Sequence, residues 1–409
     1  MAEPHSEWRG GWPVVLGAIG GMMTVAAPSA LTGMVMAPLQ QDFGWSRAQV
    51  TLSIMITAIC ALVFAPVAGT LINRYGVRAV ALIGFTSTAL GFTAVAFSGP
   101  SIWGWFGAWV IYGTMSIALG PVLWSTALSS LFDRHRGFAI SIALSGSGFA
   151  FSVWPPIVAP LIADYNWRAA YVLLAVICVA VMLPLNFFAL RALGRREAAD
   201  TARRGPAVAP VIWGPTLGEA LRSLLFWRIT AIFILAAAVS GSLMIHFYPI
   251  LTELRLSASE AAYLTAMMGP AIIVGRIGTG WLMDRLFAPY VAAVAMMLPA
   301  GSLLILMLLP SPGPIMAAAI LEGLSVGAMT GALAYLTGRY FGLRHYASIF
   351  GVLIGIFGIC MGLIPSLTGH YFDVVGSYVP LFPFMLAGTL PIGLLLVTLG
   401  RYPDPRAAD

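Results

Sequence analysis

The sequence is poor in charged residues and contains no lysine. Charged side chains make up 9% of its 409 residues, against 60% hydrophobic ones, whereas a soluble globular domain carries about 25% charge. A chain without lysine cannot contain a phosphate-binding loop of the form G-x-x-x-x-G-K-[ST], so nothing suggests ATP hydrolysis. The composition instead predicts an integral membrane protein whose main solvent is lipid.

Cysteine is also scarce. The three cysteines, Cys60, Cys178 and Cys360, fall inside apolar runs and show neither pairing nor metal-ligand spacing. We expect them to be small core residues. The sequence therefore predicts no disulfide framework, no metal site and no cofactor.

Long apolar runs are what the chain has in abundance. About 20 helical residues cross the roughly 30 Å hydrocarbon layer of a membrane. Glycine and proline inside such runs are tolerated in lipid, so we predict twelve transmembrane helices. The twelve runs cover residues 12–38, 46–72, 77–97, 101–130, 137–162, 167–193, 225–251, 258–285, 288–310, 313–339, 345–371 and 377–400.

Arginines mark one side of the predicted membrane. They cluster after the second, fourth, sixth, eighth and tenth runs, whereas the opposite side has only Arg47, Arg168 and Arg255. By the positive-inside rule, both termini and the central loop are cytoplasmic. This topology explains the formal charge of +6, so we expect membrane lipid as a partner and no nucleic acid. A basic set made of arginine alone, with abundant alanine and glycine, suggests a GC-rich bacterial genome and hence the cell inner membrane.

A polar, arginine-rich segment divides the runs into two sets of six. It predicts an N-terminal six-helix bundle over 1–193, a cytoplasmic linker loop over 194–224 and a C-terminal six-helix bundle over 225–409. The two sets repeat each other at offsets of 211, 211, 209 and 206 residues. Parallel repeats of this kind place a site at their interface near the membrane midplane. The matched pairs are Ser46 with Ser257, Gly69 with Gly280, Phe132 with Phe341, and Tyr165 with Tyr371.

Two loop sequences occupy matching positions in this repeat. GTLINRYGVR, residues 69–78, resembles the signature loop between helices 2 and 3 of the major facilitator superfamily, and GWLMDR, residues 280–285, resembles its degenerate copy between helices 8 and 9. The resemblance covers the whole chain. It implies an all-α membrane protein with the major facilitator fold, twelve transmembrane helices in two pseudo-symmetric six-helix bundles. It also implies secondary active transport by alternating access and no enzymatic activity.

Four longer segments are similar to one branch of that superfamily, the monocarboxylate transporters and oxalate/formate antiporters. The segments are WRGGWPVV, FDRHRGFAISIALSGSGFAF, HFYPILTELRLS and GRIGTGWLMDR. The chain departs from the branch at two positions. Arg9 stands where an acidic residue usually precedes GGW, and Ile272 stands where many animal members carry an aspartate. Both departures concern the route of proton coupling.

Three ionisable side chains, Arg276, Glu322 and His246, stand out as lying away from the ends of the apolar runs of the second half. Such groups face a bundle interior or a wet cavity, because a charge in the middle of lipid costs about 2.5–3.5 kcal/mol or more. The resemblance implies that Arg276 clamps a carboxylate, which its planar guanidinium suits. The alternative for Arg276 is a permanent brace with Glu322. Glu322 is a candidate for proton coupling or for a hydrogen bond with Ser325, and His246 for substrate binding and proton coupling or for a capping or interface role.

The first half has no charged residue deep in its apolar runs, so its share of a binding site must come from shape, aromatic surface and hydroxyl groups. Ordinary helix packing is the alternative for each candidate. The dicarboxylate antiporters of the resembling branch carry a second cation in the eleventh run, and GVLIGIFGICMG offers none, which favours a substrate with one carboxylate. The candidate substrate-binding residues of the first half are Thr32, Tyr112, Trp124, Ser147 and Trp154.

Polar residues at the cytoplasmic ends of the runs are candidates for gating, since charges there can bond across helix termini. Plain topology signals are the alternative. The gating candidates are Asn73, Arg74, Arg78, Asp133, Arg134, Arg136, Asp284 and Arg285.

Together, the residues and the resemblance predict a monomeric transporter that carries a small monocarboxylate, an organic anion, in symport with a proton. Two alternatives use the same fold: a drug-type exporter, which needs acidic groups in its cavity, and an anion exchanger. A membrane-embedded enzyme is disfavoured, because His246, Glu322 and three dispersed cysteines deep in the runs supply no catalytic set.

Overall fold

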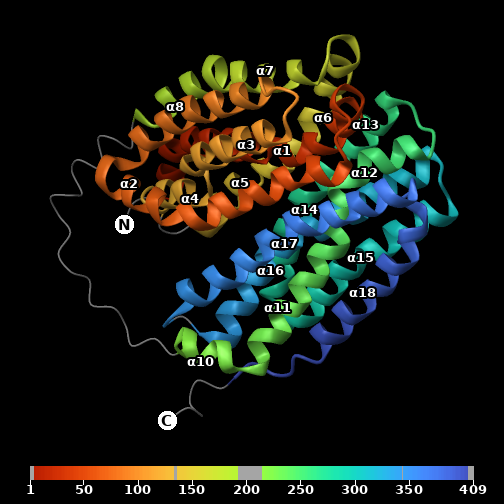
Figure 1. Cartoon of the computed structure of the whole chain (residues 1–409). Coiled ribbons are helices and arrows are strands. Elements are labelled where there is room, and N and C mark those ends of the chain that lie inside the picture. Colours follow the sequence, from red (N-terminus) through yellow and green to blue (C-terminus); the bar gives the residue numbers. More distant parts are fainter. Residues whose placement is uncertain (1–3, 133–135, 192–213, 343, 404–409) are drawn as a thin grey trace. The chain divides into compact units, whose positions relative to one another are not determined.

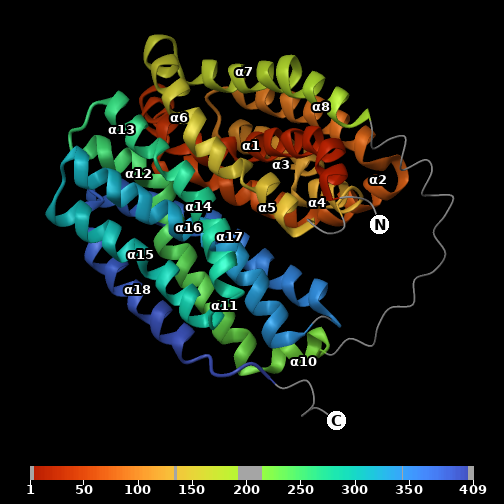
Figure 2. The ribbon, with the colours of Figure 1, turned by 180° about the vertical axis from the view of Figure 1, so that it is seen from behind.

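The computed structural model describes residues 4–132, 136–191, 214–342 and 344–403, and the regular structure in these ranges is helical throughout. The helices form two compact units, Met1–Pro206 and Ala207–Asp409 (Figures 1 and 2). The boundary between the units falls inside the segment that the sequence assigns to a linker. Within the described ranges, twelve helices are long and apolar enough to cross a membrane. This confirms the predicted number, and the protein is a multi-pass membrane protein.

Several spans of unit 1 are interrupted helices. The fourth span breaks at Gly120, whose extended backbone (φ −69°, ψ 175°) ends η1 before Pro121 begins α4. The sixth span contains a π-helical turn, η2. The segments are α1 (Pro4–Phe43), α2 (Arg47–Ala96), α3 (Ile102–Ser116), η1 (Ile117–Leu119), α4 (Pro121–Ser129), α5 (Arg136–Leu144), α6 (Gly146–Asp164), α7 (Trp167–Ile177), η2 (Cys178–Met182) and α8 (Leu183–Ala189).

The second and third spans form one long helical element, α2, with a kink at Gly76. Gly76 has φ 78° and ψ 159°, a backbone conformation that is essentially restricted to glycine because a Cβ would be strained there. The sequence predicts two separate runs on either side of this residue. The signature loop GTLINRYGVR therefore needs its glycine to turn the chain from one span to the next.

Unit 2 also combines shorter segments into spans. Its seventh span consists of α11, the π-helical turn η3 and α12, and its eighth span consists of α13 and α14. The segments are α10 (Leu217–Arg222), α11 (Leu224–Ala236), η3 (Ala237–Gly241), α12 (Ser242–Glu253), α13 (Ala258–Ala266), α14 (Met268–Met283), α15 (Ala288–Leu308), α16 (Pro312–Phe341), α17 (Tyr346–Val375), η4 (Val379–Leu381) and α18 (Phe382–Val397).

The two units share local structure at matched positions of the sequence repeat. Ser46 caps α2 in a capping box with Gln49, and Ser257 caps α13 in a capping box with Glu260. In both boxes the serine hydroxyl accepts a backbone N–H and the longer side chain accepts the N–H of the serine. Equivalent caps at an offset of 211 residues are what an internal repeat predicts.

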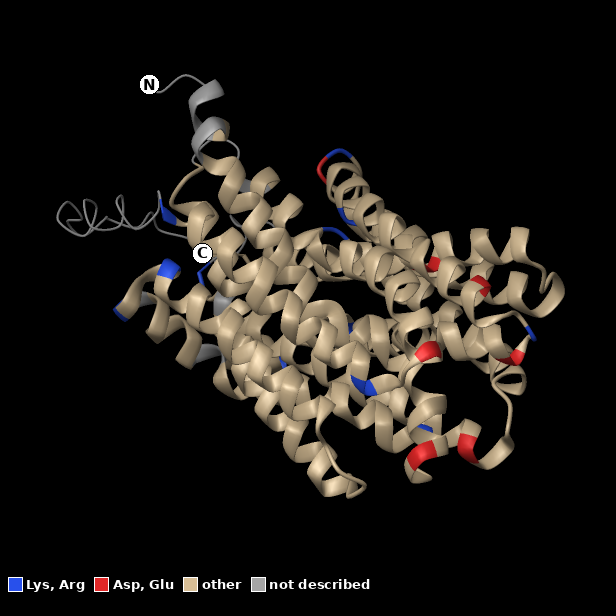
Figure 3. Ribbon diagram, turned by 90° about the horizontal axis from the view of Figure 1, so that it is seen from above, with Lys and Arg blue, Asp and Glu red and all other residues tan. Residues whose placement is uncertain are grey.

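Charged residues are sparse along both units, and the ribbon in Figure 3 is tan almost throughout. Each unit has its own apolar core, with Phe85 and Trp124 fully buried in unit 1 and Phe226 and Leu333 fully buried in unit 2. Large apolar side chains also point outward, such as Leu394, which is 67% exposed. An apolar exterior around an apolar core matches a lipid environment.

A cluster of aromatic rings packs together near the first residues of α2, α3 and α7 in unit 1. Trp105 of α3 lies at its centre, with its ring centroid 5.4 Å from that of Trp45, 5.6 Å from that of Trp109 and 5.8 Å from that of Trp167. The pairs are tilted or edge-to-face, which are the arrangements that aromatic rings prefer. The cluster fixes the ends of α2, α3 and α7 to one another.

Candidate functional site

Arg276 lies where α14 crosses α16. A Cβ on Gly275 would collide with the carbonyl of Leu324, and a Cβ on Gly327 would collide with the carbonyl of Ile272 and approach the backbone nitrogen of Arg276. With no side chains between them, the two helices contact each other through their backbones. The Arg276 side chain is half-buried. The crossing therefore fixes the base of the arginine while part of the side chain stays accessible.

Glu322 of α16 is fully buried. Its exposed fraction is 0%, and neither carboxyl oxygen has a hydrogen-bond partner among the described residues. In that part of the chain Glu322 forms no ion pair with Arg276, so the alternative of an Arg276–Glu322 brace is wrong for this structure. The hydroxyls of Ser325 and of the neighbouring Ser240 are buried as well and also lack hydrogen-bond partners in the described ranges.

His246 of α12 is fully buried and has a hydrogen-bond partner at each ring nitrogen. Nε2 lies 2.8 Å from the carbonyl oxygen of Pro365, and Nδ1 lies 2.7 Å from the hydroxyl of Tyr378. Because a carbonyl oxygen only accepts, Nε2 carries the proton, and Nδ1 of the neutral ring accepts from Tyr378. Glu253, at the end of the same helix, accepts a hydrogen bond from the backbone nitrogen of Tyr378 at 3.1 Å. A contact between His246 and a substrate would require one of its two hydrogen bonds to break.

The substrate-binding candidates of unit 1 are bonded to backbone carbonyls. Thr32 donates to Pro28, Trp124 to Leu119, Ser147 to Leu144 and Trp154 to Met23. The hydroxyl of Tyr112 likewise donates to the backbone carbonyl of Val25, at a long distance of 3.5 Å. Tyr112 differs from the other four candidates because its side chain lines a cavity of about 260 Å³. This cavity lies within unit 1 and is mostly apolar, with a few hydroxyl groups in its lining. Apart from Tyr112, its lining includes Val25, Pro28, Ser29, Thr57 and Ser116.

Three of the gating candidates stack on aromatic rings at helix ends. The guanidinium carbon of Arg74 lies 5.3 Å from the ring centroid of Tyr75, that of Arg78 lies 5.0 Å from Phe187, and that of Arg285 lies 3.8 Å from Trp281. Such contacts stabilise a cation beside an aromatic face. Of the others, Asn73 lies in α2, Arg136 begins α5 and Asp284 caps α14, whereas Asp133 and Arg134 lie outside the described residues.

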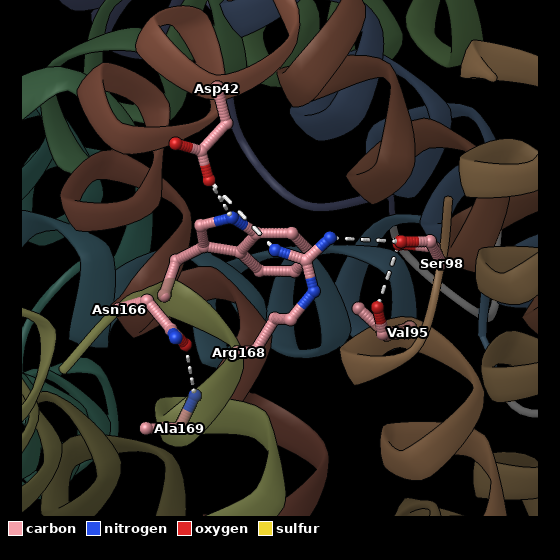
Figure 4. A network of polar contacts seen from close by, with 7 residues as sticks. Asp42, Val95, Ser98, Asn166, Arg168 and Ala169 are labelled. Atoms are coloured by element: carbon pink, nitrogen blue, oxygen red, sulfur yellow. Dashed lines mark hydrogen bonds and ion pairs between the residues drawn. The ribbon is translucent and has the colours of Figure 1, made fainter. Parts of the chain in front are cut away.

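A polar network that the sequence analysis did not single out joins α1, α2 and α7 (Figure 4). Asp42 accepts a hydrogen bond from Trp167 Nε1 at 2.9 Å and forms an ion pair with Arg168 at 3.9 Å. Arg168 also donates to the carbonyl of Ser98 at 3.4 Å. Asp42 lies 125 residues before Trp167, and the adjacent residues Trp167 and Arg168 bring two donors to its carboxylate.

Ser240 and Tyr378 were also missed. Ser240 lies in η3, and no pattern in its segment AAVSG distinguishes a π-helical turn from an α-helix. Tyr378 is 132 residues from His246 along the chain. Its nearness to Glu253 and His246 follows from tertiary packing and has no signal in the sequence.

Comparison with known proteins places the chain among membrane transporters. The sequence profile of the Major Facilitator Superfamily matches residues 17–365. Monocarboxylate transporter 13 of Bos taurus is 27% identical over 413 aligned residues, covering 94% of this chain and 89% of its own. Monocarboxylate transporter 11 of Homo sapiens is 26% identical, covering 99% and 85%, and monocarboxylate transporter 12 of Mus musculus is 23% identical, covering 93% and 83%. These relatives are mammalian, so they do not support the bacterial origin predicted from composition.

Proposed function

Because the chain belongs to the Major Facilitator Superfamily and is therefore a transporter rather than an enzyme, we propose that it carries a small monocarboxylate across the membrane together with a proton. The observation that carries this proposal is Arg276, a half-buried guanidinium inside a membrane span whose base is fixed by the α14–α16 crossing. A guanidinium stays charged at any working pH and presents a planar pair of donors that matches one carboxylate. The names of the three relatives agree with this substrate class.

The remaining candidates shape the proposed substrate site. Within unit 1, Tyr112 lines a mostly apolar cavity, and we propose that this side chain contacts the substrate. His246 is the second polar group of the proposed site. We propose that it forms a hydrogen bond with the substrate or takes part in proton coupling. The polar atoms of four candidates are already bonded to backbone carbonyls, so we propose that their side chains shape the substrate site by packing and donate no hydrogen bond to the substrate. These candidates are Thr32, Trp124, Ser147 and Trp154.

The charged groups at the helix ends are proposed to gate the cytoplasmic side, with both termini on that side. We also propose that the transporter acts as a monomer. Its assignment to a bacterial inner membrane is supported by the arginine-only basic set alone.

A binding assay tests the substrate class. The purified protein is heated with acetate, lactate, pyruvate, benzoate, oxalate or succinate, and its apparent melting temperature is measured for the wild type, Arg276→Gln and Arg401→Gln. We expect a monocarboxylate to raise the melting temperature of the wild type and of Arg401→Gln, which removes one exposed positive charge, but not of Arg276→Gln.

Two outcomes would overturn the proposal. If no acid stabilises the wild type, the drug-type exporter becomes the better reading. If the stabilisation survives Arg276→Gln, the arginine does not bind the carboxylate. A larger shift with oxalate or succinate than with any monocarboxylate would favour a dicarboxylate exchanger.

A further inference from the structure

A buried polar cluster lies inside unit 2. It comprises Glu322 and Ser325 of α16 and Ser240 of η3, each at most 1% exposed. None of their four side-chain oxygens has a hydrogen-bond partner in the described part of the chain. The hydroxyl of Ser240 lies beside the Glu322 carboxyl without meeting hydrogen-bond geometry. Buried polar groups are nearly always bonded in folded proteins, so three such groups together require an explanation.

We propose that this cluster is the proton-binding centre of the transporter, with Glu322 as the group that takes up and releases the proton. The proposal rests on the proposed function, because it names the proton site of the same transport cycle. It places that site in the interior of unit 2 rather than at the Arg276 clamp.

The chemistry of a buried carboxyl supports a proton at this position. A charged carboxylate that is cut off from water, ion pairs and hydrogen bonds is very costly. One proton removes the charge of Glu322 and turns its carboxyl into a donor that a serine hydroxyl can accept. The structure therefore fits the neutral form. When the proton leaves, the carboxylate needs water or rotated hydroxyls around it, and its buried surroundings must rearrange to supply them.

Ser240 lies in the π-helical turn η3, whose backbone can rearrange more easily than that of a regular α-helix. A π-helical turn is closed by hydrogen bonds between residues five apart and is often found at functional sites. It connects α11 to α12 in the seventh span. Gly241, next to Ser240, packs against α17, where a Cβ would come within 2.9 Å of the sulfur of Met361. A rearrangement at Ser240 is thus transmitted to both halves of the seventh span and to α17.

Helix α16 links the proton site to the anion site. Glu322 shares its helix face with Met329, Leu333 and Leu336, which pack into the core of unit 2. The face that carries Gly327 contacts α14 at the backbone nitrogen of Arg276. A shift of α16 after proton loss therefore moves the base of the arginine, which gives a physical route between the two sites.

The titratable groups of the neighbouring helices do not bond to Glu322. Among the described residues, Arg276 of α14, His246 of α12 and Cys360 of α17 form neither a hydrogen bond nor an ion pair with its carboxyl. Both ring nitrogens of His246 have other partners, the carbonyl oxygen of Pro365 and the hydroxyl of Tyr378. η3 and α18 contain no titratable residue, and α11 and α15 contain only Arg228 and Tyr290, each near the start of its helix.

Reconstituted transport tests the proposal. Full-length protein in liposomes is supplied with the radiolabelled form of the acid that gives the largest thermal shift, and entrapped pyranine reports internal pH. Three reactions are compared: uptake driven by a pH gradient, uptake driven by a sodium gradient, and exchange of labelled for unlabelled acid at equal pH. We expect the wild type to respond to pH and not to sodium. We expect Glu322→Gln, which is permanently neutral, to lose pH-driven accumulation and dye acidification while exchange continues.

Further variants keep the test decisive if Glu322→Gln fails to fold. Glu322→Asp retains a carboxyl and should restore pH-driven uptake with a displaced pH profile. Ser240→Ala removes a donor that the charged carboxylate would use, so the midpoint of its uptake profile should move to more alkaline pH. Ser366→Ala is the matched control, since among the described residues this buried hydroxyl bonds to the carbonyl of Gly362 in its own helix and to no other group.

The outcomes separate this proposal from the proposed function. Retained pH-driven accumulation in Glu322→Gln, or equal profiles for Ser240→Ala and Ser366→Ala, would overturn the proton site while leaving acid transport intact. A wild type that accumulates acid with sodium and not with pH would replace the proton by sodium. A wild type that exchanges no acid at all would instead overturn the proposed function.

Discussion

The hydroxyl of Tyr378 lies 2.7 Å from Nδ1 of His246, and this contact joins the segment after α17 to the middle of the seventh span. The ring centroids of the two residues are 5.0 Å apart. Because Pro365 occupies the other ring nitrogen, the imidazole holds α12, α17 and the chain leading to η4 together. His246 is therefore a structural junction, whatever further part it takes in transport.

Tyr378→Phe should weaken this junction. The substitution leaves a buried ring nitrogen without its donor, which costs about 1–3 kcal/mol. We expect a lower apparent melting temperature in detergent, measured by the unfolding of the purified protein. Tyr263→Phe is the control, since Tyr263 is 58% exposed. Equal melting temperatures for the two variants would show that the hydrogen bond contributes nothing.

Gly327→Ala should disturb Arg276 through the backbone. The new Cβ would collide with α14 at Ile272 and Arg276, and overpacking of this kind costs about 1–3 kcal/mol. We expect lower stability together with weaker acid binding in the thermal-shift assay. Gly331→Ala, one turn later on α16, meets nothing within 4 Å and should behave as the wild type. If both variants bind acid equally well, the α14–α16 crossing does not position Arg276 for binding.

Arg276→Lys should bind acid more weakly than the wild type even though the charge is kept. An ammonium is a point charge and cannot pair with both carboxylate oxygens in a plane. We expect a loss of about tenfold in affinity, or about 1.4 kcal/mol, measured by titration calorimetry, and a larger loss for Arg276→Gln. Wild-type affinity in the lysine variant would mean that charge alone, without the planar fork, accounts for binding.

Gly76→Ala should destabilise the turn between the second and third spans. Its φ of 78° and ψ of 159° cost a residue with a Cβ about 1–3 kcal/mol. Gly69→Ala, in the same loop sequence, places a Cβ where nothing lies within 4 Å and should gain up to about 1 kcal/mol of helix propensity. Apparent melting temperatures of the two variants should therefore move in opposite directions, and a common direction would contradict the assignment of strain to Gly76.

Asp42→Asn should have little effect on stability. The ion pair with Arg168 is 3.9 Å long and its side chains are 35% and 46% exposed, so it contributes less than about 1 kcal/mol. The asparagine oxygen can still accept the hydrogen bond from Trp167 Nε1. Melting temperatures at low and high salt would check this, and a large salt-dependent loss would show that the charge itself matters.

The sequence was sufficient for features that depend on composition and local chemistry. The length of the apolar runs predicted the twelve spans, and GTLINRYGVR predicted the family. The repeat matched Ser46 with Ser257, and in the structure both residues cap a helix in a capping box. These features are local, because lipid requires each span to satisfy its own backbone hydrogen bonds.

Features that depend on long-range packing were beyond the sequence. The partners of His246 lie 119 and 132 residues away. Other polar groups at the same level of the membrane could have bonded to it equally well, so the sequence does not identify these two. The π-helical turn at Ser240 has the same composition as an α-helical turn. The Arg276–Glu322 pair was plausible by charge, but among the described residues neither carboxyl oxygen of Glu322 has a hydrogen-bond partner.

The crowding of Trp45, Trp105 and Trp167 at one end of unit 1 has an optical consequence. Indoles this close exchange excitation energy, and their emission and near-ultraviolet circular dichroism respond to small changes in ring geometry. In the described part of unit 2, Trp227 and Trp281 are about half exposed and stand apart from that cluster in the sequence. Intrinsic fluorescence of the unlabelled protein should thus report mainly on the packing of unit 1, including the ends of α2, α3 and α7.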